Sequence, residues 1–408
     1  MLNMLKGNVF WNKNVKILKS YPYVNEDKNC DVLVVGGGIA GALTAYLQSK
    51  TGANVIIVDK NIIGYESTLT GDGTFVSTFN FEGNKKQKIL PKKTIDKCNN
   101  LLKNAMLDIE SIIYEILKDD DCKKYINELG LKHTDLLYFS DKITNKMSMY
   151  KLFEKLGSEN PEVEYLEEDP IINLKTGILI PNEGITLNPY VFTQLIFIYL
   201  SKLENVRIYE NTKVIDIHNT CDEVCSITYN NFKINSKYVI LTSGISVSEY
   251  ITNIEFNLNK VFTIVTDKIN ELDETYLNII AKDENGINIS FTKDKRIVLS
   301  GEVSRNIDKE VNINKFSSGK YKKLYITLNK LFNLDEVKIT NCFYGNYLET
   351  KDGLPVIDEL ENIPNVYCNV GVGRNGILFS MIGANCLRDI SKKYHIKDMY
   401  IFRENRDF

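Results

Sequence analysis

Histidine and tryptophan are scarce in this chain, which contains three histidines and one tryptophan among 408 residues. Its eight cysteines are scattered, and only Cys221 and Cys225 lie close together. A zinc site needs cysteine or histidine ligands grouped at short spacing. The sequence therefore predicts no metal site, and it predicts reduced, mostly buried thiols.

No sign of charge predominates either, because the formal net charge is -3 and the pI is about 5.9. This balance argues against nucleic acid and anionic membranes as partners. The longest apolar runs, at 32–35 and 196–200, are too short to cross a bilayer, and residues 1–20 lack the apolar segment of a signal peptide. We expect a soluble, cytoplasmic protein without integral membrane association.

A strand, a glycine-rich turn, a helix and a second strand follow one another near the N-terminus. Apolar residues fill both strand patterns, at 31–35 and 54–58, and the turn has the G-x-G-x-x-G spacing of Gly36, Gly38 and Gly41. A glycine-rich loop in an ordinary α/β core is the alternative interpretation. The full strand, turn, helix and strand context instead favours a dinucleotide-binding unit.

Each part of this unit has a physical role toward a bound dinucleotide. Gly36 permits the tight turn, Gly38 lets the backbone approach a pyrophosphate, and Gly41 lets the helix and strand pack closely. The N-terminus of the helix offers unpaired N–H groups to the phosphates. Asp59, at the end of the second strand, can accept hydrogen bonds from a ribose diol.

The chain does not continue the alternation of strands and helices after Asp59. Helical or β-rich segments are predicted at 94–117, 145–156, 188–203, 206–241 and 260–303. The third of these begins with Asn188 as N-cap and Pro189 at the first helical position. A hairpin turn is predicted at Asn230-Asn231.

A second unit of strand, glycine turn and helix occupies 365–370, 371–376 and 377–392. Two such units around long β-rich insertions indicate a cofactor domain assembled from both ends of the chain. FAD suits this layout better than a nicotinamide, because FAD is long and its ring can lie between two domains. The predicted fold class is α/β with an α+β insertion: a Rossmann-like FAD-binding domain, discontinuous in sequence, with an inserted antiparallel-sheet substrate domain. The predicted ranges are 30–80, 185–250 and 350–392 for the FAD-binding domain, 81–184 and 251–349 for the substrate domain, and 1–29 for an N-terminal lead-in.

Together with Gly36–Gly41 and Asp59, seven further segments carry a resemblance that covers nearly the whole length. They are Gly64–Thr68, Gly184–Pro189, Thr212–Val214, Ile240–Gly244, Arg296–Glu302, Lys351–Ile357 and Gly373–Leu378. In order and spacing the chain resembles the D-amino-acid-oxidase-like FAD-dependent oxidoreductases. That family includes glycine oxidase, sarcosine oxidase and gamma-glutamylputrescine oxidase.

The resemblance implies non-covalently bound FAD and a set of residues that hold it. These predicted cofactor-binding residues are Gly36, Gly38, Ile39, Ala40, Gly41, Asp59, Lys60, Ser67, Thr68, Gly71, Gly73, Thr74, Val214, Ser243, Gly244, Gly345, Gly373, Arg374, Asn375, Gly376 and Ile377. Gly36 to Gly41 would hold the pyrophosphate, Val214 would contact the adenine, and the helix after Gly373 would face the flavin. Covalent attachment at Cys342 is an alternative, although Cys342 does not match the position that sarcosine oxidase uses.

The resemblance also implies that a neutral amine loses hydride to flavin N5 and that the resulting imine is hydrolysed by water. Such chemistry requires no histidine, so the scarcity of histidine does not argue against catalysis. An amino-acid substrate does require an anchor for its carboxylate, best supplied by arginine. Relatives such as glycine oxidase have an arginine near the position of Tyr347, and Arg374 is the remaining candidate anchor.

The sequence thus predicts an FAD-dependent oxidoreductase for a small-molecule amine or amino acid. Our hypothesis is a substrate without the usual α-carboxylate, with Arg374, Tyr347 and Tyr344 as candidate catalytic residues and Phe343 beside them. An FAD-binding protein or redox subunit with weak or no amine oxidation is the alternative. A nicotinamide dehydrogenase is a third interpretation, which leaves the second glycine unit unexplained. The substrate, the electron acceptor and the oligomeric state stay open.

Overall fold

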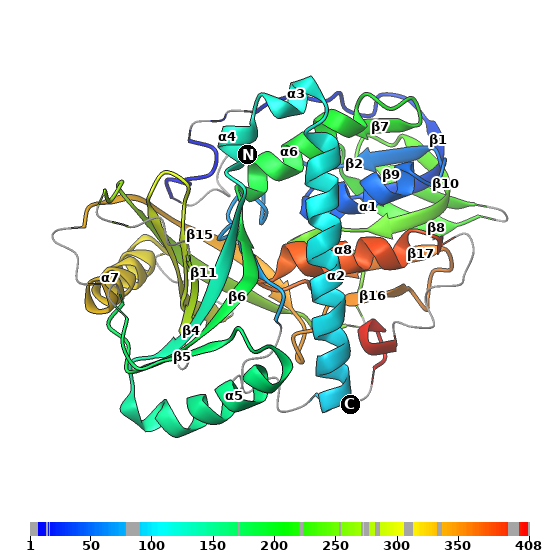
Figure 1. Ribbon diagram of the computed structural model, residues 1–408. Helices are drawn as coiled ribbons and strands as arrows, with labels where there is room; N and C mark the ends of the chain where they lie inside the picture. Colours follow the sequence, from blue (N-terminus) through cyan, green and yellow to red (C-terminus); the bar gives the residue numbers. More distant parts are fainter. Residues whose placement is uncertain are drawn as a thin grey trace.

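The computed structural model of this chain contains two β-sheets that are flanked by helices (Figure 1). It describes residues 7–13, 15, 17–78, 90–169, 172–220, 223–252, 254–270, 272, 277–281, 286–305, 313–332, 337–390 and 400–406, with the backbone alone at 277–281 and 313–317. Cys221 and the last two residues of the helix predicted at 377–392 lie outside these ranges.

The first sheet gathers strands from both ends and the middle of the chain. Its strands are β1 (Lys28–Val35), β2 (Val55–Val58), β7 (Val206–Tyr209), β8 (Val214–Asn219), β9 (Val224–Thr228), β10 (Lys233–Leu241), β16 (Val356–Glu359) and β17 (Val366–Val370). They follow the order β16-β17-β10-β1-β2-β7, with β9 pairing with β10, and β8 with β9. From β17 to β7 the neighbours are parallel, so the carboxyl ends of these strands meet at one edge.

Apolar residues cover both faces of this sheet, as expected for parallel strands between two layers. In β1, Val32 and Val34 belong to the core that contains the helices, whereas Leu33 and Val35 belong to the core on the other face. The helices on the first face are α1 (Ile39–Ser49), α2 (Lys92–Ile116), α6 (Pro189–Leu200) and α8 (Gly376–Leu387). Complete burial of each such valine or leucine contributes roughly 1.5–3 kcal/mol.

Capping residues at the helix ends, as well as apolar faces, determine where these helices form. The Asn188 side chain accepts hydrogen bonds from the backbone N–H groups of Tyr190 and Val191, each at 3.1 Å, and Pro189 opens the helix. The predicted N-cap is therefore confirmed. Short helices α3 (Asp120–Lys123) and α4 (Ile126–Leu129) connect α2 to the second sheet.

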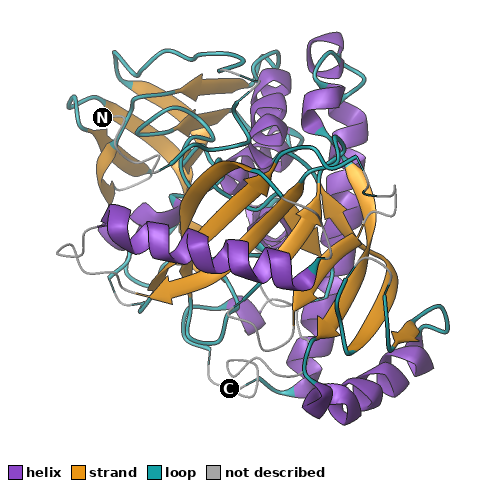
Figure 2. Cartoon of the chain, turned by 90° about the vertical axis from the view of Figure 1, so that its left-hand side faces the viewer, coloured by secondary structure: helices purple, strands orange, loops and turns teal. Residues whose placement is uncertain are grey.

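The second sheet is antiparallel except for one parallel pair, β4 with β12. Its strands are β3 (Thr74–Val76), β4 (Lys132–Ser140), β5 (Glu164–Leu166), β6 (Thr176–Thr186), β11 (Asn257–Thr266), β12 (Leu277–Ala281), β13 (Asn288–Phe291), β14 (Ile297–Arg305) and β15 (Ile339–Glu349). Helix α7 (Ile313–Leu331) crosses one face of this sheet over β11 and β14 (Figure 2). Helix α5 (Lys146–Glu159) packs near β5 and β6.

The predicted fold class is confirmed, because a mostly parallel sheet with helices is joined to a mostly antiparallel sheet. The assignment of residue ranges to two domains stays a prediction. One strand differs from those ranges: β3 lies inside the range 30–80 but pairs with β6 in the second sheet. The hairpin at Asn230-Asn231 is present, with Asn231 in the left-handed region at a φ of 62°.

The N-terminal lead-in ties the two sheets together. The Trp11 indole donates to the carbonyl of Gly71 at 2.7 Å, and the Asn188 amide donates to the carbonyl of Trp11 at 2.8 Å. The Asn341 side chain on β15 donates to the carbonyl of Asn8 at 3.0 Å. This segment therefore links the start of α6, the loop before β3 and the second sheet.

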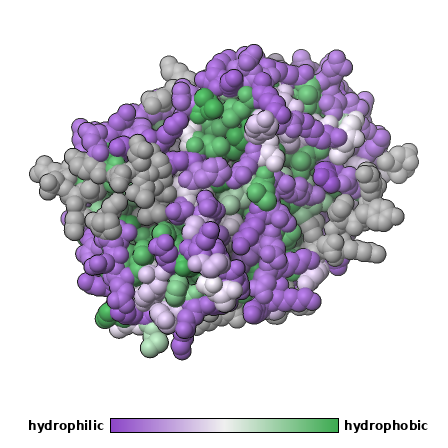
Figure 3. Space-filling view, in the orientation of Figure 1, coloured by the Kyte–Doolittle hydropathy of each residue, from purple (hydrophilic) through white to green (hydrophobic). Residues whose placement is uncertain are grey.

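Hydrophilic side chains cover most of the surface seen in Figure 3, with apolar patches between them. Within the described part of the chain, none of the helices combines the length and apolar character needed to cross a bilayer. The same residues contain no group of three or more His, Cys, Asp and Glu side chains that could hold a metal ion. The cytoplasmic location stays a prediction.

Candidate active site

A cavity of about 850 Å³, with its open mouth included, lies at the carboxyl ends of β1 and β2, beside the N-terminus of α1. Ligands of open α/β sheets bind at this edge, where strand ends and helix N-termini meet. The predicted residues among its lining are Gly36, Gly38, Ile39, Ala40, Asp59, Lys60, Ser67, Thr68, Val214, Ser243 and Gly244. Tyr250 also lines the cavity and donates a hydrogen bond to the carbonyl of Val214 at 2.8 Å, although no sequence pattern singled it out.

The glycine turn has the close contacts that its sequence spacing requires. A Cβ atom on Gly41 would lie 1.8 Å from the carbonyl oxygen of Gly36. Only glycine therefore fits at this position in the first turn of α1. Gly36 has a φ of 119°, in the region that side chains rarely adopt. Gly38, the N-cap residue of α1, provides no side-chain cap, and the helix N-terminus is left beside the cavity.

Asp59 ends β2 at the wall of this cavity. Its carboxylate accepts hydrogen bonds from the backbone N–H groups of Gly37 at 2.6 Å and Asn61 at 2.7 Å. Burial disfavours the charged form and raises the pKa of Asp59 to about 6, although the two N–H groups act in the opposite direction. The side chain is thus held in one orientation by its backbone neighbours.

A second cavity, of about 880 Å³ with its open mouth included, continues from the first. The two share the wall residues Ile39, Ser67, Thr68, Gly244, Ile245 and Val372. It lies between the first sheet and strands β11 and β15 of the second. The predicted residues that line this second cavity alone are Gly71, Gly73, Thr74, Gly345, Tyr347, Gly373, Arg374, Gly376 and Ile377. Together the two cavities give an elongated space at the junction of the sheets.

The N-terminus of α8 faces this second cavity. Asn375 is its N-cap residue, but the Asn375 amide donates to the carbonyl of Val76 at 2.9 Å and makes no cap hydrogen bond. Asn375 itself is not among the residues that line either cavity. The partial positive charge of the helix N-terminus is therefore available to an anionic group.

Arg374 makes a polar network in the second cavity. Its Nη2 donates to Asp72 Oδ2 at 2.9 Å and to Ser300 Oγ at 2.7 Å, and its Nη1 donates to the carbonyl of Gly286. Asp72 also accepts from the Asn288 amide at 3.0 Å. Sequence reasoning missed Asp72, and its only local signal was an acidic residue between Gly71 and Gly73.

Tyr347 lines the second cavity, but Tyr344 and Phe343 do not. Side chains alternate along a strand, so residues three apart on β15 lie on opposite faces. Tyr344 packs against Phe262, with ring centroids 5.7 Å apart, in the core under α7. Phe343 is buried with Trp11 in another core cluster. The structure therefore places Tyr344 and Phe343 in the core and not, as expected, beside Tyr347 in the second cavity.

The residues around the two cavities fit a bound FAD. The N-terminus of α1 and the glycine turn before it suit the pyrophosphate, and a carboxylate at the end of β2 suits the ribose. The Ser243 oxygen is buried at the first cavity and has no hydrogen-bond partner within the part of the chain that the structure describes. A polar group of the cofactor would satisfy it. Cys342 lines neither cavity.

Known proteins are similar to this chain in sequence and in fold over most of its length. The chain is 23% identical over 422 residues to the "Putative Rieske 2Fe-2S iron-sulfur protein YhfW" of Bacillus subtilis (strain 168), covering 97% of this chain and 75% of that one. It is 22% identical over 385 residues to the gamma-glutamylputrescine oxidoreductase of Escherichia coli (strain K12), covering 90% of this chain and 84% of that one.

The structure of glycine oxidase from Geobacillus kaustophilus has the same fold, with a TM-score of 0.76 and 18% identity over 93% of this chain and all (100%) of that one. The family model that describes FAD dependent oxidoreductases of the DAO type matches residues 31–390. Nearly the whole chain is thus included in the match. The chain belongs to the DAO family of FAD-dependent oxidoreductases.

Proposed function

We propose that this oxidoreductase converts the C–N bond of a primary or secondary amine to an imine, and that the second cavity holds the reacting amine. FAD, when bound, supplies the acceptor for the hydride that leaves the carbon next to nitrogen. The observation that carries the proposal is the continuity of the two cavities. The first has the features of a dinucleotide site, and the second adds a polar network and apolar walls next to it.

The residues of the second cavity would orient the amine and exclude water. Val261 and Leu348 give it apolar walls, and Tyr347 adds a phenol. Burial raises the pKa of Tyr347 to about 12, so the phenol keeps its proton at neutral pH and can donate a hydrogen bond. Positioning of a neutral amine in such a site can supply much of the rate without a dedicated base.

Anaerobic reduction of the bound flavin by candidate substrates tests the proposal. The purified holoprotein would be mixed with amino acids, N-methyl amino acids and diamines, and the absorbance of the oxidised flavin would be followed. We expect at least one amine to bleach it and to yield the corresponding carbonyl compound after hydrolysis. Dithionite serves as the control, because it shows that the flavin can be reduced. Bleaching by dithionite but by no amine would contradict the proposal.

A redox subunit with weak or no amine oxidation is the second candidate function. It is favoured by the ion pair between Arg374 and Asp72, which occupies the candidate carboxylate anchor. The name of the relative YhfW, an iron–sulfur protein, also points to electron transfer in a related chain. A flavin that no amine reduces but that exchanges electrons with a one-electron iron–sulfur protein would favour this function.

A further inference from the structure

Arg374 is committed to partners within the protein. A guanidinium binds a carboxylate in a bidentate manner through Nη1 and Nη2 or through Nε and Nη2, so both arrangements require Nη2. The two hydrogens of Nη2 already point to Asp72 at 2.9 Å and Ser300 at 2.7 Å. A substrate carboxylate could gain a bidentate contact only by displacing one of these partners.

Asp72 has one carboxylate oxygen in this network and one outside it. Oδ2 accepts from Arg374, from the Asn288 amide at 3.0 Å and from the Ser300 hydroxyl at 3.1 Å. No hydrogen bond from any described residue reaches Oδ1. The side chain is 14% exposed and lines the second cavity, so Oδ1 can still accept a hydrogen bond from a bound molecule.

The network holds Asp72 in place from three parts of the fold. Asn288 lies on β13, Ser300 on β14, and Arg374 immediately before α8. Asp72 and Arg374 are the only charged residues among the described residues that line this cavity. Since their charges offset each other, these two side chains together offer no net positive charge to a substrate carboxylate, and Asp72 repels a carboxylate that approaches Oδ1.

We propose that Asp72 is a specificity-determining residue that withholds Arg374 from substrate carboxylates and binds a cationic group of the substrate through Oδ1. The substrates are then amines that carry a second, protonated nitrogen, such as diamines, in preference to α-amino acids. One nitrogen is oxidised in its neutral form, and the other stays an ammonium group beside Asp72. This inference rests on the proposed amine oxidation.

Two probes of the same shape and opposite charge test the inference without turnover. The ammonium probe, tert-butylammonium, has no hydrogen on the carbon next to nitrogen and cannot be oxidised, and pivalate is its carboxylate counterpart. Binding of each to the holoprotein would be followed by the change in flavin absorbance. We expect the wild-type protein to bind tert-butylammonium more tightly than pivalate, and Asp72→Asn to lower this preference by about tenfold or more.

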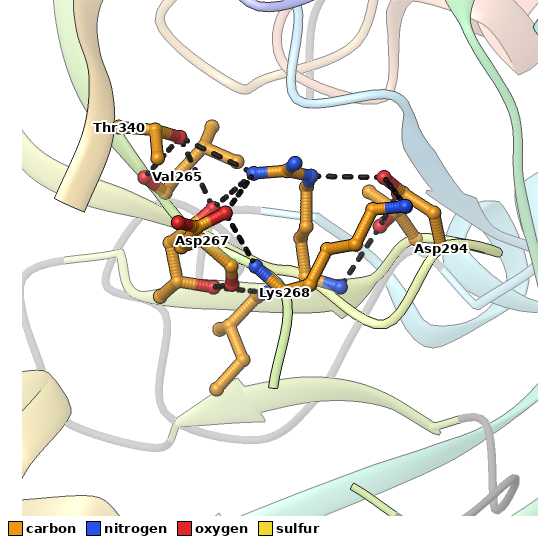
Figure 4. Close-up of polar contacts among 9 residues, drawn as sticks. Val265, Asp267, Lys268, Asp294 and Thr340 are labelled. Atoms are coloured by element: carbon orange, nitrogen blue, oxygen red, sulfur yellow. Dashed lines mark hydrogen bonds and ion pairs between the residues drawn. The ribbon is translucent and has the colours of Figure 1, made fainter. Parts of the chain in front are cut away.

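A matched control comes from another arginine and aspartate pair, in the turn between β13 and β14. Asp294 accepts from Arg296 Nε at 2.9 Å, and Figure 4 shows Asp294 with Asp267, Lys268 and Thr340 in one polar cluster. Asp294 lines neither cavity. Asp294→Asn therefore removes a paired carboxylate elsewhere, and we expect it to leave the preference between the probes unchanged.

Ser300→Ala tests the same point if Asp72→Asn fails to retain flavin. This substitution frees one Nη2 hydrogen of Arg374 and keeps Asp72, so we expect pivalate affinity to rise several-fold while tert-butylammonium still binds. A wild-type preference for pivalate would overturn the inference. So would an unchanged preference in Asp72→Asn, or unchanged pivalate binding in Ser300→Ala when Asp72→Asn does not fold. Because neither probe is oxidised, these outcomes are separate from a failure of any amine to reduce the flavin.

Discussion

Asp59 is a residue whose ionisation couples cofactor binding to pH. Two backbone N–H groups favour its carboxylate form, and burial favours its neutral form more strongly, which raises its pKa to about 6. Hydroxyl groups of a ribose donate to the carboxylate, so FAD binding favours the ionised form. Protonation of Asp59 therefore competes with FAD.

We expect FAD affinity to be constant above about pH 7 and to fall as the pH drops through 6, because the acid form that binds less well then predominates. The limiting slope is a tenfold loss for each pH unit, about 1.4 kcal/mol. Release of flavin fluorescence during dilution at pH 5 and pH 7.5 measures it. The variant Asp59→Asn should bind FAD more weakly and with a flatter pH profile. A wild-type affinity that rises toward low pH would contradict this expectation.

Elements meet at Asn188, the N-cap of α6. The side-chain oxygen of Asn188 accepts hydrogen bonds from two N–H groups of the helix. Its side-chain nitrogen donates to the carbonyl of Trp11 at 2.8 Å. The Trp11 indole in turn donates a hydrogen bond to the carbonyl of Gly71. Gly71 precedes Asp72 in the loop that lines the second cavity. One side chain thus supports a helix, the lead-in and this loop.

We expect Asn188→Ala to lower the melting temperature of the protein, since loss of an N-cap typically costs about 1 kcal/mol. Asn188→Ser keeps an oxygen that can cap the helix and removes the amide that donates to Trp11. It should therefore lower the melting temperature less, and the difference between the two variants reports the contribution of the cap. Scanning fluorimetry of the holoproteins provides the measurement. Equal loss in both variants would show that the cap contributes nothing measurable.

Local sequence patterns were sufficient to predict the helices and strands and the position of the first cavity. The glycine turn of Gly36 to Gly41 and the cap at Asn188 act over a few residues, so their patterns can be recognised in the chain alone. No local pattern could predict the polar network around Arg374, because Asp72 and Arg374 are 302 residues apart in the chain. Tyr344 does not share the cavity with Tyr347 for another reason: side chains alternate along β15, so these two rings lie on opposite faces of the strand.

At the scale of the whole molecule, the two cavities form one continuous site between the sheets. The first cavity is bounded mainly by the parallel sheet and the loop after β2, and the second also contacts β11 and β15. A ligand that fills both cavities therefore contacts more of the fold than one that fills the first alone. Preferential binding to the folded state raises stability in proportion to the logarithm of ligand concentration over Kd.

We expect removal of FAD to lower the melting temperature and added FAD to restore it. At a concentration 100 times Kd, FAD should add about 2.7 kcal/mol to the free energy of unfolding. ADP, which lacks the flavin part, should fill the first cavity only. It should therefore raise the melting temperature less than FAD at the same concentration. Melting curves of apoprotein with either compound measure the difference. An equal effect of ADP and FAD at equal concentration would contradict a site that extends through both cavities.

The position of α8 has a consequence for how the protein is made. This helix packs against α1, and β17 before it pairs with β10, yet α8 and β17 come much later in the chain than α1 and β10. Until residue 387 has left the ribosome, the apolar sides of α1 and β10 that α8 and β17 cover remain exposed. The wall formed by Arg374, Gly376 and Ile377 is also missing. A nascent chain that already contains the glycine turn thus cannot enclose its cofactor. Exposed apolar surface of this kind makes unfinished chains prone to aggregate and to need chaperones during synthesis.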